Sequence, residues 1–180
     1  MSPTNHHVTS ASDVVAIVNL LATASIEYWI SGGWGVDALV GHQSRQHRDL
    51  DLLVPFQQML SVHELLLANG FAVETDWLPT RFEMVHADGR IVDVHPIRLE
   101  DNGGARLELL EGGWWLFDAE ALSGRGSVND KPVRCVSVAQ QIHNHSGYDP
   151  THKDRLDMDL LCGHFALELP APYHPTELGR

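Results

Sequence analysis

The sequence predicts an α+β fold: a mixed sheet with flanking helices, plus a small C-terminal portion made of a β-hairpin and helices. Strand-length apolar runs alternate with helical segments in the first half, which indicates a crossover helix. Asp88-Gly89 separates two further strand-like runs and is a strong hairpin signal. The 180 residues suffice for one core. We divide them into a core, residues 1–112, and a C-terminal subdomain, residues 113–180, packed on it as one compact unit.

The helices are recognised by their ends. Ser10 or Ser12 can cap the first helix, Gly70 can stop the third, and Ser137 can cap the fourth. The proline-rich residues 170–175 cannot continue the last one. The expected helices cover residues 14–26, 34–40, 57–69, a stretch that begins at 137, and 151–164.

The strands follow from alternation and from turn residues. Trp114 and Trp115 point to opposite faces of an extended segment, so one is expected in the core and the other at a pocket or a subunit interface; which is which stays open. Asn129-Asp130 marks a second, short hairpin. The expected strands cover residues 28–30, 50–54, 71–74, 81–86, 90–95, 106–109, 114–117, 127–130 and 132–136.

An acidic pair, Asp49 and Asp51, lies at the start of the strand over residues 50–54. Alternate side chains of a strand share a face, so the two carboxylates lie on one face, roughly 6.5 Å apart along the strand. Carboxylates at that spacing can hold a pair of hard divalent cations, which bridge triphosphate oxygens. The alternative is that both acids simply form the solvated face of an edge strand.

Two glycines, Gly32 and Gly33, precede the acidic pair and connect the first strand to a helix. Glycine lets backbone N–H groups approach a phosphate, and a helix start adds unsatisfied donors and a positive dipole end. An isolated Gly-Gly is more often only a turn, but this one stands beside the Asp-x-Asp pattern. The combination is the layout of a metal-assisted nucleotidyl transfer site.

A third acid, Asp93, lies between two valines in the strand over residues 90–95 and shares a face with His95. An acid in such a strand is costly to bury unless it is paired or bound to a metal. We therefore expect Asp93 to join the acidic pair, as general base toward an acceptor hydroxyl and as ligand to a metal. A water-facing position on the sheet is the alternative.

The motifs resemble a known family, the lincosamide nucleotidyltransferases and aminoglycoside 2''-nucleotidyltransferases of the DNA polymerase β superfamily. The similarity extends over roughly residues 26–165 and is greatest to the lincosamide branch. It is carried by G-G-W-G-V-D-A-L-V-G (32–41), R-Q-H-R-D-L-D (45–51), L-S-G-R-G-S (122–127), V-R-C-V-S (133–137), H-S-G-Y (145–148), K-D-R-L-D (153–157) and L-L-C (160–162).

This resemblance implies an adenylyltransferase with a polymerase β-like nucleotidyltransferase fold. It would move a nucleoside monophosphate, AMP from ATP, onto a hydroxyl of a lincosamide-type antibiotic with the help of two Mg²⁺ ions, and so confer antibiotic resistance. Alternative acceptors are an aminoglycoside, a metabolite sugar or a protein side chain. A module that binds nucleotide without turnover is a third possibility, but it has no physical need for three acids.

The resemblance also assigns roles to residues. It places the phosphate-binding turn on Gly32 and Gly33, and the catalytic and metal-binding carboxylates on Asp49, Asp51 and Asp93.

Three charged loop or helix residues are less certain in role. Arg45 and His47 match the family's R-x-H and are expected to contact triphosphate oxygens, although ordinary loop positions explain each one equally well. Lys153 either reaches a phosphate or forms a surface pair with Asp157, four residues on. Asp37 is interpreted as structural, and its expected partner is Arg45 or Arg48.

The residues that would contact the acceptor are a separate prediction. The candidates are Glu83, Glu111, Trp77 and Trp114.

Composition narrows the partners. The formal net charge of −12 argues against nucleic acid and suits a small-molecule acceptor that carries a positive charge. No apolar run is long enough to span a membrane, and the N-terminus lacks the basic and apolar regions of a signal peptide, so a cytoplasmic location is expected. Cys135 and Cys162 are expected to be free thiols. The resemblance suggests a homodimer.

Overall fold

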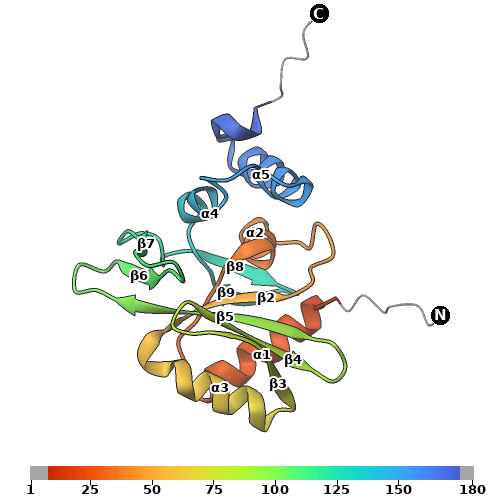
Figure 1. Cartoon of the computed structure of the whole chain (residues 1–180). Coiled ribbons are helices and arrows are strands. Elements are labelled where there is room, and N and C mark those ends of the chain that lie inside the picture. The colour runs from red at the N-terminus through yellow and green to blue at the C-terminus, as the bar shows by residue number, and fades with distance from the viewer. Residues whose placement is uncertain (1–7, 175–180) are drawn as a thin grey trace, which may run out of the picture.

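The computed structural model describes residues 8–174 and contains a seven-stranded mixed sheet, as the sequence predicts (Figure 1). Its strands are β1 (Trp29–Ile30), β2 (Leu50–Pro55), β3 (Phe71–Trp77), β4 (Arg81–His86), β5 (Ile91–Leu99), β6 (Ala105–Glu108) and β7 (Trp114–Phe117). Five of them follow the order β1-β2-β5-β4-β3, while β6 pairs with β5 and with β7. Only β2 and β5 run parallel; the other pairs are antiparallel.

The hairpin expected at Asp88-Gly89 joins β4 to β5. Gly89 adopts a positive φ of 94°, and its N–H donates to the carbonyl of His86 (2.7 Å). This hairpin sets the register between the two strands, in which Glu83 lies beside Asp93. On the other side of β5, the parallel register places Asp51 beside Asp93. Three acids from three strands thus meet in one row across the sheet.

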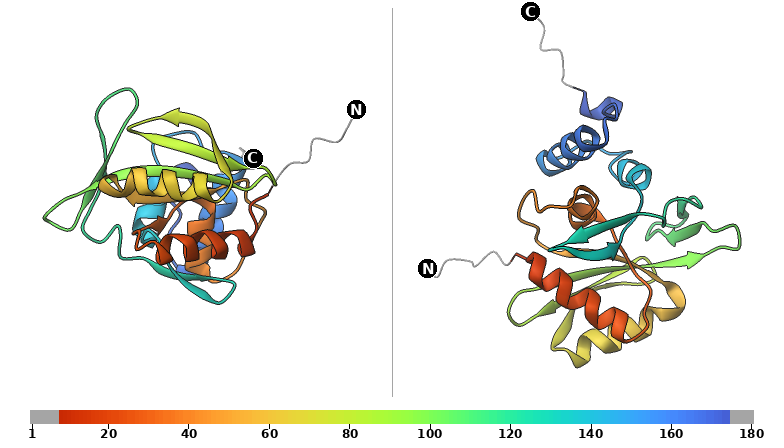
Figure 2. Two further views of the ribbon diagram at one scale, coloured as in Figure 1. Left: turned by 90° about the horizontal axis from the view of Figure 1, so that it is seen from below. Right: turned by 180° about the vertical axis from the view of Figure 1, so that it is seen from behind.

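Two helices, α1 (Ala11–Thr23) and α3 (Met59–Ala68), cover one face of the sheet (Figure 1). Seen from below, they lie across that face (Figure 2, left). A short 3₁₀ helix, η1 (Phe56–Gln58), precedes α3. Of the two serines proposed as first cap, Ser10 is the one that accepts the N–H of Asp13. The side chains of β2 and β5 that point toward these helices are apolar and buried: Leu50, Leu52, Val54, Val92 and Val94. The acidic row therefore lies on the opposite face.

The helix α2 (Gly32–Val40) lies on that opposite side, and the small hairpin of β8 (Arg125–Val128) and β9 (Lys131–Arg134) lies against α2 and the β1 edge of the sheet, where Cys135 bridges to Ile30. Asn129 and Asp130 have φ values of 48° and 60° and form the turn of this hairpin, as the sequence predicts. The hairpin packs closely on α2 at Gly126. A Cβ on Gly126 would lie 2.1 Å from the carbonyl oxygen of Ala38.

We expect Gly126→Ala to destabilise the protein by about 1–3 kcal/mol, because the added methyl group would force the hairpin and α2 apart. The free energy of unfolding in urea measures this effect. Gly163→Ala is the matched control: nothing lies within 4 Å of the added Cβ, and alanine is the better helix former by about 1 kcal/mol. Equal stability of the Gly126→Ala variant and the parent protein would contradict the close packing.

Three further helical segments complete the chain: α4 (Val138–Asn144), α5 (His152–Phe165) and the 3₁₀ helix η2 (Ala171–Tyr173). Ser137 caps α4 as expected, and Thr151 caps α5 with a capping box to Asp154. Both helices lie on the same side of the sheet as α2 (Figures 1 and 2). An apolar cluster docks α5 on α2; its buried members are Val36, Val40, Met158, Leu161 and Tyr173.

The expected boundary between residues 112 and 113 falls in the loop between β6 and β7, which pair with each other. The division into two parts stays a prediction. Cys135 and Cys162 are free and buried, as expected. Within residues 8–174, no helix is both long and apolar enough to cross a membrane. The expectation that there is no signal peptide concerns the N-terminus, of which residues 1–7 lie outside the described part of the chain.

Candidate active site

The centre of the site is a cluster of Asp51, Asp93 and His95 on adjacent strands β2 and β5. Nε2 of His95 lies 3.6 Å from Oδ1 of Asp51 and 3.7 Å from Oδ2 of Asp93. One ligand atom from each of the three side chains lies within 4.8 Å of the other two. The parallel register produces this arrangement, because it sets Asp51 directly beside Asp93 and leaves His95 two residues further on the same face.

The donor set of this cluster fits a divalent cation. Asp93 is only 7% exposed, and its Oδ1 is buried without a hydrogen-bond partner in the described part of the chain. A buried carboxylate oxygen in that state is costly unless a cation or a donor reaches it. Burial and the charge of Asp51 raise the pKa of Asp93, against the opposing effects of His95 and Arg81. A cation bound here would relieve both costs.

Asp49 lies just before β2 and outside the three-residue cluster. Its Oδ2 accepts a hydrogen bond from Nη1 of Arg48 at 2.9 Å. Burial, followed by the charge of Asp51, raises the pKa of Asp49 to about 6. Asp49 is therefore electrostatically close to Asp51, although its carboxylate is engaged by an arginine. Of the expected acids Asp49, Asp51 and Asp93, the structure thus brings Asp51 and Asp93 within ligand distance of each other, but not Asp49.

Two arginines neutralise part of the acidic row. Arg81, on β4, pairs with Oδ2 of Asp93, and its guanidinium lies over the ring of Trp77, 4.6 Å from the centroid. Nη2 of Arg48 donates to both carboxylate oxygens of Glu83 at 2.9 Å. Oδ1 of Asp93 remains the buried acid oxygen of the row that neither arginine reaches.

Gly32 and Gly33 are the first two residues of α2, rather than a turn before it. Ser31 is extended and accepts the N–H of Gly35, so the helix begins two residues earlier than expected. A Cβ on Gly32 would lie 2.1 Å from Oδ2 of Asp51, and φ at Gly32 is positive, 57°. Glycine is therefore required for the helix start to approach the acidic cluster, and this start presents an anion-binding end beside it.

A cleft of about 760 Å³ opens above the cluster. Its polar part includes Gly32, Gly33, Arg45, Asp51 and Lys153. Its apolar part is formed by Leu53, Leu107, Leu109, Trp115 and Phe117. The cleft thus joins a helix N-terminus and an acidic floor to an apolar wall, a combination that suits a nucleotide and an organic acceptor.

Arg45 reaches the cleft, but His47 does not. Arg45 is held by Asp157 of α5 through two hydrogen bonds, Nε–Oδ1 at 2.8 Å and Nη2–Oδ2 at 2.7 Å. His47 is only 2% exposed, and its Nε2 lies 2.5 Å from Oδ2 of Asp37. Asp37 also accepts the N–H and the hydroxyl of Ser44. Asp37 is therefore structural as expected, but its partners are His47 and Ser44 rather than Arg45 or Arg48, because its carboxylate closes the loop after α2.

Lys153 is exposed on α5 and lines the cleft. Among the described residues it makes no ion pair, so the surface pair with Asp157 does not form. The carboxylate of Asp157 is taken instead by Arg45 and by His145, whose Nε2 lies 3.8 Å away. The ammonium group of Lys153 is thus available to an anionic ligand.

A family model described as aminoglycoside-2''-adenylyltransferase matches residues 13–161. The chain belongs to this family. The lincosamide resistance protein of Staphylococcus haemolyticus is 36% identical over 157 residues, which are 87% of this chain and 96% of that protein. A 2''-aminoglycoside nucleotidyltransferase of Escherichia coli is 27% identical over 139 residues, 70% of this chain and 68% of that protein.

Solved structures agree with this membership in the aminoglycoside-2''-adenylyltransferase family. The lincomycin-bound lincosamide adenylyltransferase LnuA superposes with a TM-score of 0.78 at 34% identity, over 86% of this chain and 98% of that one. The aminoglycoside enzyme ANT(2'')-Ia, in complex with adenylyl-2''-tobramycin, gives 0.67 at 23% identity, over 86% and 88% of the two chains, and shows the fold alone. The nucleotidyltransferase fold and the enzyme class expected from the sequence are thereby confirmed.

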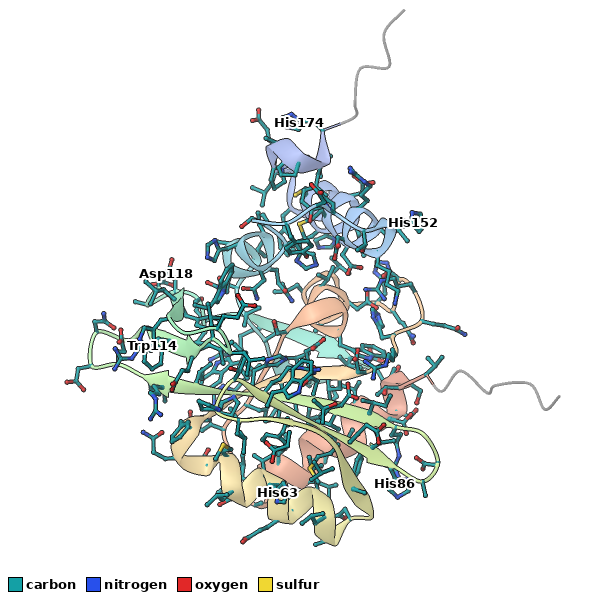
Figure 3. All side chains as sticks on the ribbon, viewed as in Figure 1. His63, His86, Trp114, Asp118, His152 and His174 are labelled. Atoms are coloured by element: carbon teal, nitrogen blue, oxygen red, sulfur yellow. The ribbon has the colours of Figure 1, made fainter. Side chains whose placement is uncertain are left out.

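The four candidate acceptor residues, Glu83, Glu111, Trp77 and Trp114, do not line the cleft described above. Glu83 is 3% exposed and bound to Arg48, so its carboxylate is not open to the cleft. Trp115 lines the cleft, with its ring stacked on His143 (centroids 4.6 Å apart). Trp114 is 40% exposed and carries Arg106 on its ring, at the outer edge of the sheet (Figure 3). Trp115 is partly buried and packs against a core cluster that includes Phe117 of the same strand, whereas Trp114 points to the exposed side, so the expected division between the two tryptophans is present.

Sequence reasoning missed two residues of the site, His95 and Asp157. The strand alternation places His95 on the face of Asp93, but the Asp-x-Asp pattern contains no histidine and assigns it no role. For Asp157 the sequence suggests only a surface pair with Lys153, as one of two alternatives, yet Asp157 is only 2% exposed. The available signal was its position in α5 between the buried Leu161 and the capping residue Thr151.

Proposed function

We propose that this adenylyltransferase-family protein transfers AMP from ATP to a hydroxyl group of a lincosamide-type antibiotic, with the assistance of divalent cations. The carboxylate of Asp51, which lines the cleft next to the glycine start of α2 and lies beside Asp93, carries the proposal. The 36% identity to a lincosamide resistance protein supports this acceptor over the aminoglycoside one, for which identity is 27%.

The acids have distinct roles in this proposal. Asp49, Asp51 and Asp93 would hold the cations, expected to be two Mg²⁺ ions, which supply charge neutralisation to the triphosphate when bound. Asp93 accepts the proton of the acceptor hydroxyl as that oxygen attacks the α-phosphorus. Its raised pKa suits a group that must take up a proton.

The remaining residues bind the triphosphate. Gly32 and Gly33 present the N-terminus of α2 to phosphate oxygens, and Arg45, whose guanidinium lies beside Gly33, and Lys153 also line the cleft. His47, which is buried against Asp37, contributes by fixing the loop that carries Arg45 rather than by direct contact. Pyrophosphate leaves on the side of the cleft where the side chains of Arg45 and Lys153 lie.

An aminoglycoside is the second candidate acceptor, favoured by the net charge of −12 and by the matching family model. A metabolite sugar or a protein side chain would require the same chemistry at Asp93. From the sequence we also propose that the protein is a cytoplasmic homodimer and that it has no nucleic-acid partner. We further propose that the chain divides into a core and a C-terminal subdomain between residues 112 and 113. Light scattering on the purified protein tests the dimer.

We expect a mass gain of one AMP on lincomycin or clindamycin when the protein is incubated with ATP and Mg²⁺. Mass spectrometry of the drug and pyrophosphate release are the measurements, and a panel of aminoglycosides runs in parallel. The Asp51→Asn variant is the negative control, because it removes one carboxylate from the cluster. A mass gain on aminoglycosides alone would favour the aminoglycoside as the acceptor. No mass gain on any of the drugs would refute both candidate acceptors.

A further inference from the structure

The imidazole of His95 has an unusual position in the acidic cluster. Its Nε2 is 3.6 Å from Asp51 and 3.7 Å from Asp93, so it hydrogen-bonds to neither at ordinary lengths, yet it faces both. For bond lengths of about 2.1 Å, neighbouring ligand atoms around one cation lie roughly 3 Å apart and opposite ones roughly 4.2 Å. The three ligand atoms, all within 4.8 Å of one another, are close to this spacing.

We propose that Nε2 of His95 is a ligand of the active-site cation, together with carboxylate oxygens of Asp51 and Asp93. The site then offers nitrogen as well as oxygen. Imidazole binds Mn²⁺ and, more strongly, Co²⁺, whereas Mg²⁺ prefers oxygen. His95 therefore adds more to the affinity of this cluster for a first-row transition metal than to its affinity for Mg²⁺. This inference deepens the proposed function, because it concerns the same cluster.

The alternative role for His95 is that of a protonated counter-ion between the two acids. The structure argues against it in two ways. Arg81 already pairs with Oδ2 of Asp93, the oxygen that His95 faces, so a second positive charge there is not needed. Oδ1 of Asp93 stays buried without a partner, and a protonated His95 placed at Oδ2 does not satisfy it. A cation that takes Oδ1 leaves the pair with Arg81 in place.

The surroundings of His95 also suit a metal ligand. Its side chain is 21% exposed and lines the cleft, so a cation can enter from the solvent side. In β5 it follows Val94 and precedes Pro96, which both point to the other face of the sheet. The strand backbone thus fixes the direction of the ring. A ligand held by a rigid strand is preorganised for binding.

Electron paramagnetic resonance with Mn²⁺ tests this proposal without turnover. We expect bound Mn²⁺ to show modulation from a directly coordinated ¹⁴N, both with the metal alone and with a non-hydrolysable ATP analogue. His95→Gln should abolish the modulation and weaken Mn²⁺ binding about tenfold or more. The Mg²⁺ concentration that displaces half of the Mn²⁺ should fall by a similar factor, because Mg²⁺ gains little from imidazole.

The matched control is His63→Gln, since His63 lies on α3 across the sheet from the cleft, where it packs edge-on against Phe82 (Figure 3). This variant should retain the modulation and the affinity. Absence of ¹⁴N modulation in the parent protein under both conditions would overturn the proposal, and so would unchanged Mn²⁺ affinity in His95→Gln. A protein that shows the modulation but transfers AMP to no acceptor would refute only the proposed function.

Discussion

Asp93→Asn is expected to lower the rate of AMP transfer on the order of 10²- to 10⁴-fold, the contribution usual for a general base and for charge stabilisation at a metal site. The amide has nearly the shape of the carboxylate but can neither accept the proton of the acceptor nor bind a cation strongly. The fold should survive, because the substitution removes a buried charge; its burial, and then the charges of Asp51 and Glu83, raise the pKa of this acid.

The loss of activity should appear in kcat. The KM for ATP should change less, because the glycine start of α2 and the basic side chains of Arg45 and Lys153 remain. Steady-state rates of pyrophosphate release with saturating acceptor measure both constants. Asp88→Asn is the control in the adjoining hairpin: Asp88 is exposed and pairs with Arg90, outside the cleft. A kcat within a few-fold of the parent value in Asp93→Asn would exclude Asp93 as the base.

The sequence predicts the fold well because its signals are local. Ser137 caps α4 with its own side chain, and the Asn129-Asp130 turn determines the β8–β9 hairpin from two positive φ angles. The alternation in β2 and β5 separates a helix-covered apolar face from an acidic face, as the pattern requires. The start of α2 is the exception. Glycine is a poor helix former, and only the close approach to Asp51 shows why Gly32 stands inside the helix.

The site is only partly predictable, because several of its contacts join residues distant in the sequence. Arg45 and Asp157 are 112 positions apart, and no local pattern indicates that they pair. The buried pair of His47 and Asp37 spans 10 positions across the loop after α2, so its closure depends on how that loop folds back. His47 therefore matches the motif, but its side chain is buried against Asp37 and does not line the cleft.

The buried ion pair between the loop after α2 and α5 leads to the second large expected effect. We expect Asp157→Ala to lower the free energy of unfolding by about 3 kcal/mol, because it leaves Arg45 and His145 without their shared partner. The figure is at the lower end for buried pairs, since Arg45 is 19% exposed. For a chain of this length the midpoint of thermal unfolding should fall by roughly 6–12 °C.

The pH profile of stability distinguishes this network from simple packing. Burial would raise the pKa of Asp157, but the hydrogen bonds from Arg45 and His145 lower it overall, so this contribution is lost as pH falls through the folded value. Burial would lower the pKa of His145, but Asp157 and the carbonyl of Gln141 raise it overall, so that contribution is lost as pH rises through its folded value. Stability from the network is greatest between these limits.

Asp157→Ala should therefore flatten the pH dependence of unfolding as well as lower its midpoint. It should also raise the KM for ATP, because Arg45 loses the carboxylate that holds its guanidinium at the cleft. Asp159→Ala, at an exposed position of the same helix, controls for the loss of an acid from α5. If the two variants unfold alike and bind ATP alike, Arg45 is held in the cleft by the loop itself, and the pair with Asp157 adds nothing to it.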